Sequence, residues 1–405
     1  MARSERTGAR KGLRYDVVIV GGGTAGVTVA ARTRRMRPEL SVALIEPSEK
    51  HFYQPIWTLV GAGEAPREAS WRSQKSVIPP GVTWLQDAVT EFAPEEHAVL
   101  TRYGRRVEYR ALVAAPGIQL DWDAIPGLRE SLGKDGVCSN YSYDAVERTW
   151  EFLRGFRGGT AIFTQPGSAI KCAGAPQKIA YLADDYFRRS GVREKTQLIF
   201  ASGMPSLFAV AHYAPALEAV MRRKGIDARY RHELAELRPD VRQAVFRRLD
   251  TEERVVLQYD LLHVTPPQSA PDFVKRSPLA GAGGWIDVDP HTLQHRSFAS
   301  VFSLGDASSA PTSKTGAAVR KQAPVVVENL LAFLDARPLP ARYDGYASCP
   351  LVTGYGKLIL AEFDYEKLPR ETFPVDQRKE RWSLYMAKKH VLPRLYWDRM
   401  LKGLF

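Results

Sequence analysis

Cysteine is scarce in this chain, which has only Cys138, Cys172 and Cys349 among its 405 residues. Three cysteines are too few for the disulfide framework that stabilises small secreted domains. Each one is therefore either a small buried hydrophobic residue or a reactive thiol. The residues around each cysteine bear on which of these two roles it has.

Long apolar runs are also missing from the sequence. No stretch approaches the roughly 18 consecutive apolar residues that a membrane-spanning helix needs. Residues 1–14 are basic and lack the apolar core of a secretory signal, so they predict a short arm. Hydrophobic residues make up 44% of the chain and charged residues 25%, which is typical of a folded protein of two or three domains.

Acidic residues are too few to balance the basic ones, and the net charge of +12 favours an anionic partner: nucleic acid, acidic lipid or an anionic cofactor. Half of this excess falls in the C-terminal tail, residues 378–405, where aromatic and aliphatic residues are interleaved with the basic ones. Pro393 divides the tail into two short helices, and Trp397, Leu401 and Leu404 share one helical face. This pattern predicts amphipathic helices on an anionic membrane and disfavours nucleic acid, while a helical pair packed on the core is the alternative.

A glycine motif stands near the start of the chain. Residues 15–20 form an apolar, β-branched run that predicts a buried parallel strand, and a helix is expected over 24–36. Between them the pattern Gly-x-Gly-x-x-Gly allows a tight turn that brings the backbone close to a pyrophosphate at the helix N-terminus. A second strand over 41–45 ends in an acidic residue that suits a ribose. The residues expected to hold the nucleotide are Gly21, Gly23, Thr24, Ala25, Gly26 and Glu46.

A second signal near the far end of the chain favours FAD over NAD. Residues 301–306 predict a short strand that ends in Leu304, Gly305 and Asp306, and a Gly-Asp pair in this place is typical of FAD-linked enzymes. A helix from near residue 315 to about 333 would point its N-terminus at the flavin ring. Together with Lys314, this positive helix end would stabilise an anionic reduced flavin.

The middle of the chain repeats the strand and helix alternation but lacks a second glycine motif. Strands are expected over 159–164 and 197–201, with a helix over 176–189. After the second strand only Gly203 is present, and Pro205 adds bulk and removes a backbone donor. The sequence thus predicts a second Rossmann-like domain without a nucleotide, and a reductant other than NAD(P)H.

Two of the cysteines have neighbours that suit redox chemistry. Cys172 follows Lys171 and precedes a helix that Pro176 would open, and both features favour the thiolate. Cys349 stands before Pro350 in an extended segment. Sequence spacing alone does not place the two residues within the roughly 4.4–6.8 Å Cα separation of a disulfide, so their partnership stays open at this point.

The chain resembles sulfide:quinone oxidoreductases, and more closely the branch that includes the mitochondrial enzyme. The resemblance runs from about residue 15 to the C-terminus and is most specific over 51–63, 171–178, 311–315 and 343–355. It implies an α/β protein with two Rossmann-like (FAD/NAD(P)-type) domains and a C-terminal amphipathic helical membrane-association region. Residues 1–150 and 269–340 would bind FAD, residues 151–268 would form the second Rossmann-like domain, and residues 341–405 would carry the second redox cysteine and the membrane-binding tail.

The resemblance also implies roles for individual residues. Sulfide would attack an oxidised Cys172–Cys349 pair, Cys349 would carry the persulfide, and Cys172 would leave as a thiolate and pass two electrons to FAD. Quinone would reoxidise the flavin, and glutathione, sulfite, cyanide or a second sulfide would accept the outer sulfur. Gln54, Val89 and Lys314 match positions that contact FAD in relatives. Cys138 is expected to be a bystander.

This interpretation predicts a peripheral protein on the bacterial cytoplasmic membrane, or on the mitochondrial inner membrane in a eukaryote. No metal site and no nucleic-acid partner are expected, and the sequence leaves a homo-oligomer open. Two other enzymes fit part of the pattern. A type II NADH:quinone dehydrogenase is disfavoured by the missing second glycine motif, and the flavoprotein subunit of a flavocytochrome sulfide dehydrogenase is disfavoured by the amphipathic tail.

Overall fold

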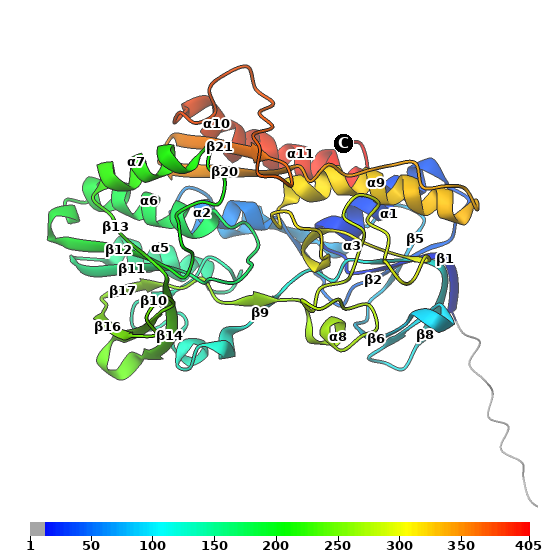
Figure 1. The fold of residues 1–405 in the computed structure, drawn as a ribbon, viewed down its shortest axis with the longest axis horizontal. Helices are drawn as coiled ribbons and strands as arrows, with labels where there is room; N and C mark the ends of the chain where they lie inside the picture. Colours follow the sequence, from blue (N-terminus) through cyan, green and yellow to red (C-terminus); the bar gives the residue numbers. More distant parts are fainter. Residues whose placement is uncertain (1–12) are drawn as a thin grey trace, which may run out of the picture.

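The computed structural model describes residues 13–405, so the basic arm expected over residues 1–14 lies almost wholly outside it. Two mainly parallel sheets lie side by side along the molecule, and helices from both ends of the chain cover one side of them (Figure 1). Within residues 13–405 no helix is both long enough and apolar enough to cross a membrane.

The first sheet runs in the order β5-β2-β1-β8-β7-β6. Strand β19 also pairs with β8, at residues 112–114. The central strands of this sheet are parallel, and β6 and β7 form an antiparallel edge. Val17, Val18 and Ile19 are fully buried, as expected of a parallel strand covered on both faces. The bounds are β1 Leu13–Val20, β2 Val42–Ile45, β5 Val82–Leu85, β6 Val89–Ala93, β7 Ala98–Thr101, β8 Arg106–Ala114 and β19 Val301–Ser303.

Two helices from opposite ends of the chain pack together beside this sheet. They are α1 (Thr24–Met36) and α9 (Gly316–Leu334) (Figure 1). The Thr315 side chain caps α9 by accepting a hydrogen bond from the backbone N–H of Ala318. Both helices match their predicted ranges to within one residue, and the strand 301–303 lies next to β8. The two predicted parts of the FAD-binding unit therefore share one sheet.

The second sheet contains five parallel strands in the order β10-β17-β11-β12-β13. The strands and the helix predicted here are confirmed, and their ends differ by one residue. A separate antiparallel sheet, β14-β15-β16, follows in the chain. The bounds are β10 Val137–Cys138, α5 Val146–Gly155, β11 Gly159–Gln165, α6 Ala175–Arg189, β12 Thr196–Ser202, α7 Ala214–Lys224, β13 Asp227–Tyr230, β14 His232–Arg238, β15 Gln243–Arg248, β16 Arg254–Gln258 and β17 Leu261–His263.

Short elements fill the connections. Strand β3 pairs with the nearby β4, and β9 pairs with β18, which lies far from it in the sequence. The bounds are β3 Lys50–Phe52, α2 Trp57–Val60, β4 Trp71–Ser73, α3 Gln74–Val77, β9 Gln119–Leu120, α4 Leu128–Ser131, β18 Gln268–Ser269 and α8 Asp272–Lys275.

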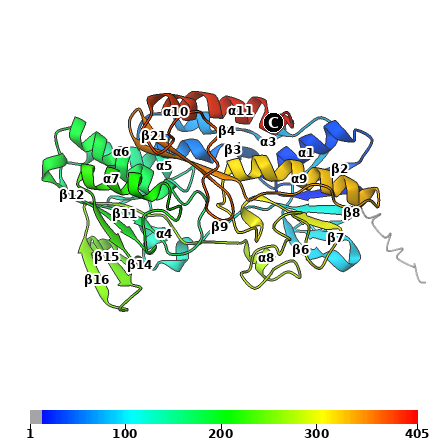
Figure 2. The same cartoon turned by 45° about the horizontal axis from the view of Figure 1, so that its top comes forward.

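The C-terminal part forms a hairpin, β20 (Ala347–Gly354) and β21 (Lys357–Phe363), and then the two short helices of the tail. These are α10 (Trp382–Met386) and α11 (Leu392–Asp398), separated by a π-helical turn at 387–391. Figure 2 shows both helices on the side of the molecule that carries α1. The tail is helical as predicted, but Pro393 lies in the first turn of α11, and a π-helical turn rather than the proline joins the two helices.

The prediction that Trp397, Leu401 and Leu404 face outward is wrong for the first two residues. Trp397 and Leu401 are 6% and 3% exposed, while Leu404 is 42% exposed. The Trp397 ring packs against Tyr53 and against His51 of β3, so this face of α11 covers the core. The amphipathic pattern is real, but its apolar side is used mainly inside the protein.

Candidate active site

The glycine loop, residues 21–26, joins β1 to α1 and is folded tightly. A Cβ on Gly26 would lie 1.9 Å from the carbonyl oxygen of Gly21, so a side chain at Gly26 would collide with the loop backbone. Gly21 itself has a φ of 97°, in the left-handed region that favours glycine. A Cβ on Gly23, by contrast, would meet no atom of the described chain within 4 Å. The loop thus keeps an open side at the N-terminus of α1, where a pyrophosphate fits.

Glu46 lies directly after β2, at the carboxyl end of the strand next to β1. Its carboxylate accepts hydrogen bonds from the backbone N–H groups of Gly22 and Ser48, at 2.7 Å each. Burial raises the pKa of Glu46 even though both N–H groups favour the charged form. The predicted acid is therefore beside the glycine loop, and its oxygens help to shape that loop.

The Gly305-Asp306 turn follows β19 and faces the start of α9. Gly305 has a φ of 70° and donates its backbone N–H to Gln322 Oε1 at 2.8 Å. Lys314 Nζ donates to the carbonyl oxygens of Asp306 and Ser308, at 2.7 and 3.1 Å. Burial lowers the pKa of Lys314 to about 8, although Asp306 opposes the shift. The turn and Lys314 thus lie together just before α9, and the predicted contact of Lys314 with the flavin stays a prediction.

Buried polar atoms near this unit suit a bound flavin. Within residues 13–405, Trp57 Nε1 and Gln268 Nε2 are buried donors that find no hydrogen-bonding partner. Gln268 Oε1 accepts from the backbone of Lys171, and Lys171 Nζ lies 5.7 Å from the centroid of the Trp57 ring. The carbonyl oxygens and ring nitrogens of a flavin are acceptors that such donors require. Of the other predicted contacts, Leu304 is buried before the turn, Val89 opens β6, and Gln54 is exposed in the turn before α2.

The structure brings two of the three cysteines together. The Sγ atoms of Cys172 and Cys349 are 3.8 Å apart, although 177 residues separate them in the sequence. Cys172 lies in the loop between β11 and α6, and its backbone N–H donates to the carbonyl of Lys314 at 2.9 Å. Cys349 is the third residue of β20, and a Cβ on Gly174 would lie 2.7 Å from its sulfur. Glycine at 174 therefore permits the close approach of the two thiols.

A buried lysine that the sequence analysis did not single out lies next to this pair. Lys178, in the first turns of α6, donates to Cys172 Sγ at 3.2 Å and is 2% exposed. The pKa of Cys172 is well below its usual value because Cys349 donates to its sulfur and Lys178 supplies positive charge, which together outweigh burial. The same hydrogen bond, together with burial, raises the pKa of Cys349. Because Lys178 contacts the Cys172 sulfur directly, negative charge in the reduced pair is favoured on Cys172.

The side chains of Lys171 and Lys388 lie in different surroundings from those predicted from the sequence. Lys171 was expected to sit beside the Cys172 sulfur, but its Nζ points at the rings of Trp57 and Tyr141. Lys388 was counted with the basic side of the tail, yet it is buried and donates to the carbonyl of Pro55. Burial and the nearby charge of Lys178 lower the pKa of Lys388 to about 8, while the two cysteine sulfurs oppose the shift.

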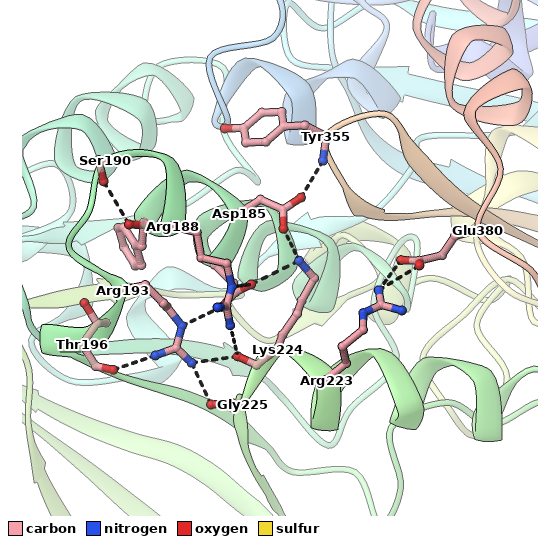
Figure 3. Close-up of polar contacts among 12 residues, drawn as sticks. Asp185, Arg188, Ser190, Arg193, Thr196, Arg223, Lys224, Gly225, Tyr355 and Glu380 are labelled. Atoms are coloured by element: carbon pink, nitrogen blue, oxygen red, sulfur yellow. Dashed lines mark hydrogen bonds and ion pairs between the residues drawn. The ribbon is translucent and has the colours of Figure 1, made fainter.

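A buried ionic cluster, which we call the clamp, ties α6 to the hairpin that carries Cys349 (Figure 3). Lys224 binds Asp184 at 3.2 Å and also binds Asp185, and Asp185 accepts the backbone N–H of Tyr355 at 3.0 Å. Arg193 donates to Asp184 at 2.6 Å. Because α6 begins just after Cys172 and packs along β20, the clamp fixes the far ends of the two elements that hold the sulfurs.

Cys138 lies apart from this site. It is fully buried in β10, where it pairs with His263 of β17, and burial raises its pKa to about 12. A thiol in that state stays protonated and is a poor nucleophile. This environment agrees with the predicted role of a bystander.

The junction after β12, where a second nucleotide would bind, is filled by the chain itself. The backbone N–H of Gly203 donates to the carbonyl of Gln165 at 2.8 Å, and a Cβ on Gly203 would lie 2.5 Å from the backbone nitrogen of Gly167. The next helix, α7, begins only at residue 214. The carboxyl end of β12 thus lacks an adjoining helix N-terminus of the kind that α1 provides.

Comparisons with known proteins agree with this geometry. The family model for pyridine nucleotide-disulphide oxidoreductases matches residues 15–149. The mitochondrial sulfide:quinone oxidoreductase of Mus musculus is 50% identical over 391 residues, which cover 96% of this chain and 87% of that protein. The corresponding protein of Dictyostelium discoideum is 46% identical, with 96% and 86% covered. The chain belongs to the sulfide:quinone oxidoreductase family.

The fold of this chain is shared by a solved structure, the sulfide:quinone oxidoreductase from the hyperthermophilic bacterium Aquifex aeolicus, with a TM-score of 0.83. That protein is 18% identical in sequence, and the match covers 96% of this chain and 92% of that one. The α/β flavoprotein fold expected from the sequence is thus confirmed over nearly the whole chain. The family is one of flavin-dependent oxidoreductases, and the predicted resemblance is confirmed.

Proposed function

We propose that this chain oxidises hydrogen sulfide to sulfane sulfur and delivers the two electrons through FAD to a membrane quinone. The observation that carries the proposal is the Cys172–Cys349 pair, with sulfurs 3.8 Å apart and a buried lysine 3.2 Å from one of them. Family membership supplies the substrates, and the pair supplies a two-electron relay between them. The glycine loop, Glu46 and Asp306 would hold FAD, which would supply the two-electron acceptor between the cysteine pair and the quinone.

The position of Lys178, 3.2 Å from the Cys172 sulfur, favours Cys172 as the leaving group and therefore favours attack of the substrate on Cys349. A thiol of lower pKa is the better leaving group in thiol–disulfide exchange. Hydrosulfide therefore attacks Cys349 of the oxidised pair, the bond between Cys349 and Cys172 breaks, and Cys172 leaves as a thiolate that Lys178 stabilises. Cys349 now carries the added sulfur as a persulfide.

Two further events complete the cycle. A nucleophilic acceptor such as glutathione, sulfite, cyanide or sulfide bonds to the outer sulfur of the persulfide and leaves Cys349 as a thiolate. Re-forming the Cys172–Cys349 bond then releases two electrons. They equal in number the two electrons that the substrate sulfur lost. The sulfur atoms and electrons therefore balance, and the protein returns to its oxidised form.

Two α/β units support the proposed domain division: residues 1–150 and 269–340 for FAD, and 151–268 for the second unit. Residues 341–405 then contribute Cys349 and the tail. In this arrangement the first unit holds the nucleotide, and the second unit contributes Cys172 from the loop before α6.

The tail provides the proposed membrane contact, with different residues from those first expected. Trp382 and Val391 are 66% and 48% exposed, and Leu404 and Phe405 are also exposed at the chain end. Exposed basic residues accompany them: Arg378, Lys379, Arg394, Arg399 and Lys402. Aromatic and basic side chains in this mixture suit the headgroup region of an anionic bilayer, from which a quinone can be collected. A bacterial cytoplasmic or mitochondrial inner membrane fits, and relatives of this chain are named mitochondrial.

Sulfide-dependent reduction of a soluble quinone analogue by the purified protein tests the proposed function. Cys172→Ser and Cys349→Ser are expected to lose turnover by at least about 10³-fold while they keep bound FAD, because each removes one sulfur of the relay. Cys138→Ser is the matched control, since it removes a buried thiol outside the site and should retain turnover. Full turnover in either of the first two variants would remove that residue from the mechanism.

Vesicle binding tests the membrane contact separately. Trp382→Ser is expected to weaken co-sedimentation with phosphatidylglycerol vesicles by about tenfold, because a large interfacial aromatic is lost. Tyr103, in the turn between β7 and β8, is also 66% exposed, so Tyr103→Ser removes a comparable ring from another surface. Equal binding of the two variants would argue against the tail as the contact.

A further inference from the structure

Helix α11 of the tail is hydrogen-bonded to the glycine loop through two buried side chains. The Tyr396 hydroxyl lies 2.8 Å from Thr24 Oγ1 and 2.6 Å from His51 Nε2. His51 Nδ1 lies 2.9 Å from the carbonyl oxygen of Gly22. His51 and Tyr396 are 2% and 6% exposed. A continuous chain of hydrogen bonds thus joins the end of the protein to the loop that follows β1.

Elementary chemistry fixes the direction of each bond in this chain. A carbonyl oxygen only accepts, so His51 Nδ1 carries the proton. Burial lowers the pKa of His51 to about 4, which leaves the ring neutral and makes Nε2 an acceptor for the Tyr396 hydroxyl. The Tyr396 oxygen then accepts from Thr24. The Thr24 hydroxyl is used in this bond, and its backbone N–H remains for an anion at the first turn of α1.

The same contacts hold the Gly22 carbonyl in one orientation. His51 Nδ1 and Gln74 Nε2 both donate to it, at 2.9 Å each. A carbonyl oxygen turned toward a pyrophosphate would repel it, whereas a carbonyl held by two buried donors stays directed into the protein. Tyr396 orients the His51 ring from its other side, so the tail contributes to this orientation.

The rest of the tail continues along α1. A Cβ on Gly403 would lie 2.8 Å from the backbone nitrogen of Arg32, and Gly403 has a φ of 67°. Arg32 Nη1 donates to the carbonyl of Phe405 at 2.8 Å. The tail is therefore seated on α1 from Thr24 to Arg32, on the side shown in Figure 2. The exposed Leu404 and Phe405 belong to the same seated segment.

We propose that Tyr396 and His51 are positioning residues that hold the glycine loop in its phosphate-binding shape, so that FAD retention and docking of the tail on α1 favour each other. This inference rests on FAD occupying the glycine loop, as in the proposed function. Because coupling between two equilibria is reciprocal, bound FAD must strengthen the docking of the tail as much as the docked tail strengthens FAD binding.

Rebinding of FAD to the apoprotein, followed by quenching of flavin fluorescence, is the first test. Tyr396→Phe keeps the ring and removes only the hydroxyl, and we expect a dissociation constant for FAD about tenfold higher than in the wild type, the effect of one lost buried hydrogen bond. Tyr385→Phe is the control. It is a 3% exposed tyrosine of the same tail whose hydroxyl donates to Glu64 at 2.9 Å, away from the loop. The inference is overturned if the two variants bind FAD equally well.

Limited trypsin cleavage after Arg394 and Arg399 gives a second readout, which reports on the tail itself and does not depend on flavin fluorescence. We expect FAD to slow cleavage of the wild-type tail about tenfold relative to the apoprotein, and to slow it much less in Tyr396→Phe. Equal cleavage of wild-type apoprotein and holoprotein would overturn the coupling. Failure of the wild-type protein to bind FAD at all would instead overturn the proposed function, so the two failures are distinguishable.

Discussion

Three strand-to-helix junctions of this protein follow the carboxyl ends of parallel strands and hold different contents. After β1, the glycine loop turns within three residues into α1 and leaves an open side for a pyrophosphate. After β11, the connection to α6 places Cys172 just ahead of the helix and beside Lys178. After β12, the chain fills the space itself, with the backbones of Gly203 and Gly167 in contact.

The difference shows how one framework supports two kinds of chemistry. A helix N-terminus stabilises negative charge, whether on a phosphate or on a thiolate. The space next to the backbone decides which of the two a junction can hold. A pyrophosphate needs an open glycine loop, whereas a cysteine thiolate needs only a nearby cation. In the second unit the backbone of Gly203 lies close to Gly167 after β12, and Cys172 lies at the junction after β11.

The largest effect should come from closing the first junction. Gly26→Ala places a Cβ 1.9 Å from the Gly21 carbonyl, and we expect protein without bound flavin. Gly203→Ala creates a comparable collision, 2.5 Å from Gly167, at the filled junction. The second variant should unfold at a lower temperature yet keep its FAD. The measurements are the flavin absorbance per mole of protein and the thermal unfolding temperature of both variants. Loss of flavin from Gly203→Ala would contradict the assignment of the two junctions.

Removing the cation at the second junction should have an intermediate effect. The pKa of Cys172 is depressed in part by Lys178, so Lys178→Met raises it and lowers the thiolate fraction near pH 7. Alkylation of Cys172 in the reduced protein, followed by mass spectrometry, should slow by about ten- to a hundredfold, with its pH profile moved to higher pH.

Lys171→Met distinguishes the observed arrangement from the one expected from sequence. Lys171 Nζ faces the rings of Trp57 and Tyr141, so its loss should shift the alkylation profile less than the loss of Lys178. A larger shift for Lys171→Met would mean that the cation that stabilises the thiolate has been assigned to the wrong lysine.

The smallest effect on chemistry should come from the clamp. Lys224→Met leaves Asp185 without its buried cation, and we expect the free energy of unfolding to fall by about 3 kcal/mol. Turnover should fall only severalfold and flavin content should not change, because the clamp acts on the far ends of α6 and β20. Lys195→Met, at an exposed lysine of the same unit, is the control for denaturant unfolding. A loss of FAD from Lys224→Met would show that the two units are more tightly coupled than this account allows.

Several strands, helices and turns could be predicted from the sequence, because short stretches of neighbouring residues determine them. The β1 run, the glycine loop, α1 and the Gly305-Asp306 turn occur where the sequence predicts them, since strand hydrophobicity and glycine geometry act over a few residues. The fully buried Cys138 also agrees with its predicted role.

Contacts between distant segments could not be predicted from spacing. The separation of Cys172 and Cys349 depends on how α6 packs along β20, and Lys178 lies beside the sulfur because the loop that carries Cys172 leads directly into α6. Trp397 and Leu401 were expected to face lipid, but a helical apolar face has the same pattern whether it covers a bilayer or the protein core. Only the seating of α11 against Tyr53 and His51 decides between them.

Anaerobic rapid mixing of the FAD-loaded protein with either sulfide or NADH, followed at the flavin absorbance, tests the central claim most directly. The sulfur pair at the second junction and the filled space after β12 predict that sulfide bleaches the flavin within the turnover time, that NADH leaves it oxidised, and that Cys172→Ser no longer responds to sulfide. Rapid bleaching by NADH, or unchanged bleaching by sulfide in Cys172→Ser, would contradict it.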